Sequence, residues 1–296
     1  MKPCVLFNPA ARSEKAAEFR KRLESLRLEL ELRETTSAES ARNLARIAVG
    51  QGFNTVVAVG GDGTFNEVLN GVGADPKAFE SVRLGILPLG TVNVFAKELG
   101  LPLDLDAALD VLRRGNERSV DLAVASFQEN DRRVQRYFGQ LGGAGLDSRA
   151  IELVDWESKK RFGAFAYIKA GLKAIVETQV KLTVSNGSES LTGEMVLIGN
   201  GRYYGGKVEI FPKASLTDGL LHAVVFERVH WADLVWRGWG LFTQTISRQD
   251  GVRVLRGSKL ELWCDRAVPF QLEGDLVGKL PCSFEVLPQT LRMIVP

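Results

Sequence analysis

A chain of 296 residues is long enough for two domains or for one large one. Its hydrophobic share of 45% and charged share of 25% are those of an ordinary folded protein and exclude a disordered chain. The formal net charge of +2 is too small to indicate a polyanionic partner, so we expect no nucleic-acid binding.

The cysteine and histidine content and the lengths of the apolar runs indicate the cellular compartment. Three widely spaced cysteines and two histidines give neither a disulfide framework nor a zinc-site spacing. The N-terminal apolar stretch ends at Asn8-Pro9, which is too soon for a signal peptide. No uncharged apolar run reaches the roughly 18 residues of a membrane-spanning helix. We therefore expect a cytoplasmic protein whose contact with a membrane would be transient and at its inner face.

The first 115 or so residues alternate between strand and helix patterns. Short apolar runs predict strands at residues 4–7, 54–59 and 82–87, and the alternation of leucine with charge predicts a half-buried strand at 28–33. Helical patterns lie between them, at residues 14–26, 38–49 and 64–72. Strands that alternate with helices predict a parallel, doubly wound α/β sheet.

The pattern changes after Gly115 to a series of short β-like runs. These runs lie at residues 119–126, 134–140, 181–184, 195–198, 222–226, 252–255, 259–263, 283–286 and 291–295. They predict an antiparallel sandwich or barrel, interrupted by helical stretches at 160–177 and 231–247. We expect one domain over residues 1–120 and a second over 121–287, with the strand at 288–296 able to join the first.

Small and polar residues follow each of the first four predicted strands. They are Asn8-Pro9, Thr35-Thr36, the glycine loop at 60–64 and the segment at 90–93. The carboxyl ends of parallel strands meet at one edge of a sheet, where ligands bind. The four loops therefore predict a nucleotide-sized site at that edge.

The third loop reads Gly-Gly-Asp-Gly-Thr and carries the strongest signal. Its glycines allow the backbone N–H groups to approach phosphate oxygens, and a helix that begins near Thr64 adds its N-terminal dipole. Asp62 supplies a carboxylate suited to a magnesium–phosphate complex. Taken alone, the loop is equally compatible with a glycine turn in which Asp62 caps the helix.

Further motifs follow in order along nearly the whole chain. They are Asn8-Pro9 and the segments at 60–67, 87–93, 142–147, 160–163, 166–167, 199–200, 212–214, 218–220 and 273–275. As a series they resemble the diacylglycerol kinase catalytic domain family, which includes bacterial lipid kinases and sphingosine kinases. The resemblance implies a nucleotide-binding α/β domain followed by a β-sandwich, with the active site in the cleft between them.

The resemblance also implies an activity and its residues. The activity is transfer of the γ-phosphate of ATP, with Mg²⁺, to a lipid hydroxyl in phospholipid metabolism. The residues expected to bind ATP are Asn8, Thr35, Gly60, Gly61, Asp62, Gly63, Thr64, Phe65, Asn66, Gly90, Thr91 and Asn93, with Thr36 as the alternative to Thr35. The residues expected at a structural magnesium site are Ser215, Asp218 and Leu220. A plain hairpin turn is the alternative reading of Asp218-Gly219.

Glu273 is expected to be the general base and Asp275 the second candidate, with Asp62 facing the metal. An exposed turn between strands is the alternative for Glu273-Gly274-Asp275. The order of the two carboxylates is reversed from the Asp-Gly-Glu that is usual in the family. Val94 stands where the family often has Asp, so that carboxylate is missing or replaced.

Two segments could touch a membrane. Lys159, Lys160 and Arg161 precede an apolar helix, and Trp231 and Trp239 share a helix face. For the first segment, a solvated helix start is the favoured interpretation. A core or a homodimer interface explains the tryptophans.

Two other functions stay open: a soluble-substrate kinase of the NAD kinase type, and a nucleotide-binding regulatory module without catalysis. Within the lipid kinases, the sequence does not distinguish diacylglycerol from phosphatidylglycerol, a sphingoid base or ceramide.

Overall fold

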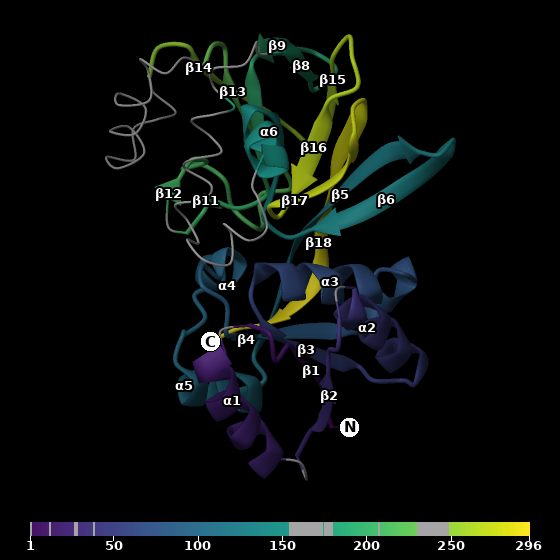
Figure 1. Cartoon of the computed structure of the whole chain (residues 1–296), viewed down its shortest axis with the longest axis vertical. Coiled ribbons are helices and arrows are strands. Elements are labelled where there is room, and N and C mark those ends of the chain that lie inside the picture. Colours follow the sequence, from purple (N-terminus) through teal and green to yellow (C-terminus); the bar gives the residue numbers. More distant parts are fainter. Residues whose placement is uncertain are drawn as a thin grey trace.

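The computed structural model describes residues 2–11, 13–26, 29–37, 39–153, 174, 180–206, 208–229 and 249–296. Figure 1 shows an α/β part below and a β-rich part above, joined by two long strands. The α/β part consists of β1 (Cys4–Phe7), α1 (Ser13–Ser25), β2 (Glu31–Glu34), α2 (Ser40–Gly50), β3 (Thr55–Gly60), α3 (Asp62–Val72), a 3₁₀ helix (Pro76–Glu80), β4 (Arg83–Pro88), α4 (Val94–Glu98) and α5 (Leu105–Arg114).

The β-rich part contains most of the remaining elements. They are β5 (Glu117–Glu129), β6 (Arg132–Phe138), β7 (Leu141–Gly145), α6 (Leu146–Leu153), β8 (Leu182–Ser185), β9 (Ser190–Gly193), β10 (Met195–Gly199), β11 (Tyr203–Tyr204), β12 (Val208–Glu209), β13 (Leu221–Phe226), β14 (Val252–Gly257), β15 (Lys259–Trp263), β16 (Pro269–Leu272), β17 (Asp275–Lys279) and β18 (Cys282–Ile294).

The sheet of the α/β part has parallel strands in the order β2-β1-β3-β4. Side chains alternate between its faces, as the period of two in a strand requires. Leu6, Ala58 and Ile86 pack under α2 and α3, whereas Phe7 and Val59 pack under α1 and α5. Helices on both faces confirm the doubly wound α/β prediction (Figure 1).

The strand β18 continues this sheet into the β-rich part. Arg292 and Met293 pair in parallel with β4, and most of the length of β18 pairs antiparallel with β5. On its other edge β18 pairs with β15, which leads on to β8 and β9. One sheet therefore runs through both halves. The sequence predicted two strands here, at 283–286 and 291–295. They form one strand with an irregularity between Leu287 and Leu291.

A second antiparallel sheet, in the order β14-β13-β10-β7-β16-β17, faces the extended first sheet. The apolar layer between them includes the edge-to-face ring pairs of Phe284 with Phe138 and with Phe270. The predicted β-sandwich is therefore confirmed. The helical stretches predicted at 160–177 and 231–247, with their basic residues and tryptophans, lie outside the described residues apart from Ala174, which is helical.

Several elements were not predicted from the sequence. The β7 strand reads Leu-Gly-Gly-Ala-Gly and lacks the β-branched residues that usually mark a strand. Helix α5 has an Asp104 N-cap and ends at Gly115 with φ +67°, which are ordinary helix signals that the sequence reading overlooked. Over the described part of the chain, no helix is both long and apolar enough to cross a bilayer.

Asp121 ties the two halves together at the start of β5. Its side chain is fully buried and accepts hydrogen bonds from the N–H groups of Gly219 at 2.7 Å and Gln289 at 2.9 Å. Gln289 lies in the irregular stretch of β18 and has φ +48°. Leu216, in the loop that Asp121 holds, packs into the core of the α/β part. One carboxylate thus fixes both the irregular β18 segment and the loop that seals the core beneath it.

We expect Asp121→Ala to lower the free energy of unfolding by about 2–5 kcal/mol, because two buried backbone N–H groups lose their acceptor. Urea denaturation followed by circular dichroism measures this. Asp110→Ala is the control, since the side chain of Asp110 is 64% exposed and the change should be within about 0.5 kcal/mol. Equal stability of the two variants would contradict the assignment.

Candidate active site

The predicted glycine loop forms the turn from β3 into α3. Asp62 begins the helix and Gly61 precedes it in extended conformation. The first N–H groups of a helix have no acceptor within the helix, so this end can bind an anion. A Cβ on Gly60 would lie 2.3 Å from Thr64 Oγ1, so the loop can turn this tightly only with glycine there.

The loop after β4 packs directly on the glycine loop. A Cβ on Gly90 would lie 2.4 Å from the Cα of Gly61. Asn93, at φ +53°, donates from Nδ2 to the Gly90 carbonyl at 2.8 Å. Asp62 Oδ1 in turn accepts from the Phe95 N–H at 3.2 Å. The structure therefore brings together the two loops that the sequence placed at one edge of the sheet.

The remaining predicted ATP-binding residues lie around these loops in different ways. Asn8 donates from Nδ2 to Thr64 Oγ1 at 3.1 Å, which ties the loop after β1 to the glycine loop. Phe65 is buried and stacks on Phe95, so this ring pair connects the helices that follow the two loops. Thr35 is also buried, whereas Thr36 is exposed. The exposed and half-buried positions include Thr91, Gly63 and Asn66.

Glu273 belongs to the tight turn between β16 and β17, and β16 runs toward the α/β part in Figure 1. Leu272 pairs with Asp275, which leaves Glu273 and Gly274 as a two-residue loop with φ of +53° and +86°. Positive φ at both positions is typical of a type I′ hairpin turn. A glutamate at positive φ is uncommon and marks a position where the surrounding structure imposes the conformation.

The Glu273 carboxyl group is held by consecutive backbone amides. Its Oε1 accepts from the N–H groups of Gly139 at 2.9 Å, Gln140 at 2.7 Å and Leu141 at 3.4 Å. Burial, with a smaller contribution from the negative charge of Asp62, raises the pKa of Glu273 from 4.5 to about 7. The amides act in the opposite direction. A carboxyl group from the β-rich part thus lies within electrostatic range of Asp62.

The other predicted acid, Asp275, is exposed and begins β17 on the far side of the turn. Val94 is the first residue of α4, directly after Asn93, so the chain has no carboxylate at that position. Glu98, at the end of the same helix, bonds instead to residues of the β-rich part.

Glu98 and Gln140 connect the loop after β4 to the Glu273 turn. The Glu98 side chain is 3% exposed and accepts from Arg202 Nε at 2.9 Å and from the backbone N–H of Arg202 at 2.8 Å. It also accepts from Gln140 Nε2 at 3.2 Å, while the Gln140 N–H binds Glu273. Sequence reasoning missed these two residues. The contacts join positions more than 40 residues apart and leave no linear motif.

The predicted structural magnesium site has an all-oxygen donor set. The Asp218 carboxylate accepts from the N–H groups of Ser215 and Leu220 and lies 2.9 Å from His222 Nε2. Within the described residues, no cluster of three or more acidic, histidine or cysteine side chains forms a metal site. The Ser215 hydroxyl, the Asp218 carboxylate and the Leu220 carbonyl are nevertheless ligands that Mg²⁺ accepts, with water completing the shell. The donor set is therefore chemically compatible with Mg²⁺.

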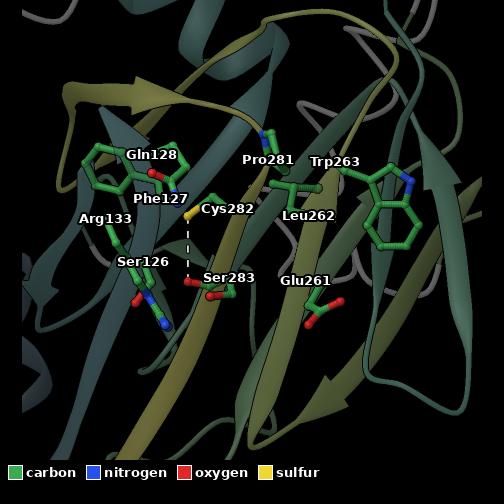
Figure 2. A pocket seen from close by; sticks show the side chains of 10 residues that line it. All are labelled: Ser126, Phe127, Gln128, Arg133, Glu261, Leu262, Trp263, Pro281, Cys282 and Ser283. Carbon is green, nitrogen blue, oxygen red and sulfur yellow. Dashed lines mark hydrogen bonds between the residues drawn. The ribbon is translucent and has the colours of Figure 1, made fainter. Parts of the chain in front are cut away.

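An open pocket of about 460 Å³ lies elsewhere in the β-rich part, among β5, β6, β15 and β18 (Figure 2). Ser126, Ser283 and Glu261 are cross-strand partners and share one face of the sheet there. None of the predicted site residues lines this pocket. Ligand sites for apolar chains are mostly enclosed and apolar, so this open, partly polar surface is a poor fit for a lipid chain.

Comparison with protein families agrees with the geometry of both halves. The model described as "Diacylglycerol kinase catalytic domain" matches residues 2–125. The model described as "YegS C-terminal NAD kinase beta sandwich-like domain" matches residues 142–295. Together they span the glycine loop, the Glu273 turn and both sheets.

Similar individual proteins share this organisation. A protein named diacylglycerol kinase from Staphylococcus carnosus (strain TM300) is 25% identical over 304 residues, covering 99% of this chain and 94% of the relative. A second protein named diacylglycerol kinase, from Staphylococcus saprophyticus, is 28% identical, and the match covers 88% of this chain and 81% of the relative. A crystal structure of a diacylglycerol kinase from Bacillus anthracis str. Sterne superposes with a TM-score of 0.77 at 20% identity, over 100% and 97% of the two chains. The chain therefore belongs to the diacylglycerol kinase catalytic domain family, as the sequence motifs predicted.

Proposed function

We propose that the protein transfers the γ-phosphate of ATP to a hydroxyl group of diacylglycerol or a related membrane lipid. One observation carries this proposal. Glu273, a carboxyl group with its pKa raised to about 7, comes from the β-rich part into electrostatic range of Asp62 at the glycine loop. A phosphate-binding helix end and a proton acceptor thus belong to the same site.

The nucleotide side is supported by the loops of the α/β part. The phosphates would lie against the N-terminal end of α3, beside the point where Gly61 and Gly90 let the two loops pack together because neither has a side chain. Thr64, fixed by Asn8, lies in the first turn of that helix. In this proposal Asp62 would face a bound Mg²⁺, which would neutralise the charge that develops on the phosphate oxygens.

The acceptor side is supported by the chemistry of Glu273. A pKa near 7 leaves a large share of the group ionised at neutral pH and still basic enough to take a proton. In the proposed step, the lipid hydroxyl oxygen forms a bond to the γ-phosphorus. The bond from that phosphorus to the β–γ bridging oxygen breaks, and ADP leaves. The hydroxyl proton passes to Glu273.

Diacylglycerol is the first acceptor to test, because the relatives from two Staphylococcus species carry the name diacylglycerol kinase. Phosphatidylglycerol, a sphingoid base and ceramide present a comparable hydroxyl beside apolar chains. We propose that the protein reaches such lipids by transient contact with the membrane surface.

We expect labelled γ-phosphate from magnesium–ATP to appear in one lipid of a mixed-micelle panel containing these four lipids. Glu273→Gln should lower kcat about 10²- to 10⁴-fold with ATP binding retained, because only the proton acceptor is lost. Asp62→Asn should lower kcat and weaken Mg²⁺-dependent ATP binding. Thin-layer chromatography measures the transfer and calorimetry the binding.

Asp275→Asn is the matched control, since it removes an exposed carboxylate next to the same turn. It should keep kcat close to that of the wild type. A strong loss in Asp275→Asn with an active Glu273→Gln would reverse the two roles. ATP binding without phosphorylation of any lipid would favour the regulatory module, and phosphorylation of NAD would favour a soluble-substrate kinase.

The raised pKa of Glu273 also predicts a pH-dependent stability difference. A folded-state pKa of about 7 against 4.5 in the unfolded chain stabilises the wild type below pH 4.5, and this stabilisation is lost as the pH rises through 7. Glu273→Gln removes the titration. The variant should therefore gain about 1–3 kcal/mol over the wild type between pH 5 and pH 8.

Urea unfolding of both proteins in EDTA, without nucleotide, measures this difference at several pH values. Asp275→Asn again serves as the control and should track the wild type. A pH-independent difference between Glu273→Gln and the wild type would show that Glu273 does not have a raised pKa.

A further inference from the structure

Gln271 connects the Glu273 turn to a carboxylate in the β-rich part. Its side chain is 1% exposed and lies on β16, opposite Gly143 of β7. Oε1 accepts from the Gly274 N–H at 2.8 Å, and Nε2 donates to Asp147 Oδ2 at 2.8 Å. Each end of the amide group therefore has a defined partner.

The Gly274 contact bears directly on the catalytic geometry. Gly274 is the second residue of the two-residue loop, at φ +86°, and Glu273 before it is at φ +53°. A backbone at positive φ for a non-glycine residue persists only when its neighbours hold it. The hydrogen bond from the Gly274 N–H to Gln271 Oε1 is one such constraint. It fixes the turn from inside the hairpin, while the amides of residues 139–141 fix the carboxyl.

Asp147 determines which way the Gln271 amide points. An amide side chain has two orientations of nearly equal shape, one with oxygen and one with nitrogen toward a given neighbour. Asp147 lies in the first turn of α6, and its Oδ1 accepts from the Tyr204 hydroxyl at 2.6 Å. Asp147 Oδ2 accepts from Gln271 Nε2 while Oδ1 accepts from Tyr204, so Gln271 presents its nitrogen to Asp147. Its oxygen then faces the Gly274 N–H.

We propose that Asp147 is a positioning residue that acts on Glu273 through Gln271, by holding the Gln271 amide in the one orientation that binds Gly274. This inference rests on the proposed role of Glu273 as the base. Asp147 keeps some exposure as a residue, but its carboxyl is densely surrounded, and burial raises the pKa of Asp147. An asparagine would avoid that desolvation penalty, but it would not specify the orientation of the amide.

Substitutions that exchange a hydrogen-bond donor for an acceptor test this proposal, because they leave the shape of the side chain nearly unchanged. In Asp147→Asn, the new amide nitrogen can face Gln271, which turns the Gln271 oxygen away from Gly274. In the double variant Asp147→Asn/Gln271→Glu, the carboxylate at 271 accepts from both the new amide at position 147 and the Gly274 N–H, so both bonds return. Tyr204→Phe is the matched control, because it removes the other hydrogen bond to Asp147 and leaves Gln271 in place.

Two measurements are made on all three variants. One is kcat and the ATP KM with dioleoylglycerol in detergent micelles and magnesium–ATP. The other is hydrogen exchange of the Gly274 amide by NMR on ¹⁵N-glycine-labelled protein. We expect Asp147→Asn to lose about 10- to 100-fold in kcat with little change in the ATP KM, and to lose protection at Gly274. The double variant should recover most of both, and Tyr204→Phe should stay near the wild type.

The exchange data keep this inference distinct from the proposed function. Wild-type protection of Gly274 in Asp147→Asn would overturn the inference, whatever the activity. A double variant that is no better protected than Asp147→Asn would overturn it as well. Loss of protection with unchanged kcat would also overturn it, because the amides of residues 139–141 would then hold the Glu273 carboxyl without the Gln271 contact.

Discussion

Two opposing physical effects act on the pKa of the Glu273 carboxyl group, and much of the structure depends on the balance between them. Taking a carboxyl group out of water favours its neutral form, and the nearby charge of Asp62 has the same effect. Backbone amides that favour the ionised form offset part of this. The balance leaves a pKa near neutrality, but only while the turn stays against residues 139–141. A small displacement of the turn would lose those amides.

The same requirement explains why the two halves are joined so firmly. The glycine loop belongs to the α/β part and Glu273 to the β-rich part, so a relative movement of about 1 Å would misplace the groups proposed to react. Three connections resist such movement: the shared sheet through β18, the buried Asp121, and the Glu98–Gln140 contact. Each lies on a different element, so they constrain both sliding and rotation.

The sequence predicted the parts of the molecule that local patterns determine. The strands of the α/β part and their polar loops were found because buried strands are apolar and their carboxyl ends meet at one edge. Helix α3 begins two residues earlier than predicted, at Asp62, because the glycine loop already forms its first turn. The glycine-rich β7 was missed because its stability comes from its neighbours β10 and β16 rather than from its own residues.

Contacts between residues far apart in the sequence could not be predicted from the sequence. Gln140 and Glu273 are 133 positions apart, and only the sandwich brings the amide to the carboxyl. Solvent exposure distinguishes the two threonines that are candidates for ATP binding, since Thr35 is buried and Thr36 is exposed. The reversal of Glu273 and Asp275 relative to the family also becomes intelligible only in three dimensions. The first acid turns inward at positive φ and the second begins an exposed strand.

The placement of β18 has a consequence for how the chain reaches its native state. This strand is made after every other described strand, yet it covers the edge of β4, which is complete some 200 residues earlier along the chain. During synthesis the α/β part therefore emerges with an open sheet edge and an incomplete core, since Leu291 and Met293 belong to that core. Open edges of this kind favour pairing with other chains. Because β18 unites the two halves, this edge stays open until β18 has been made.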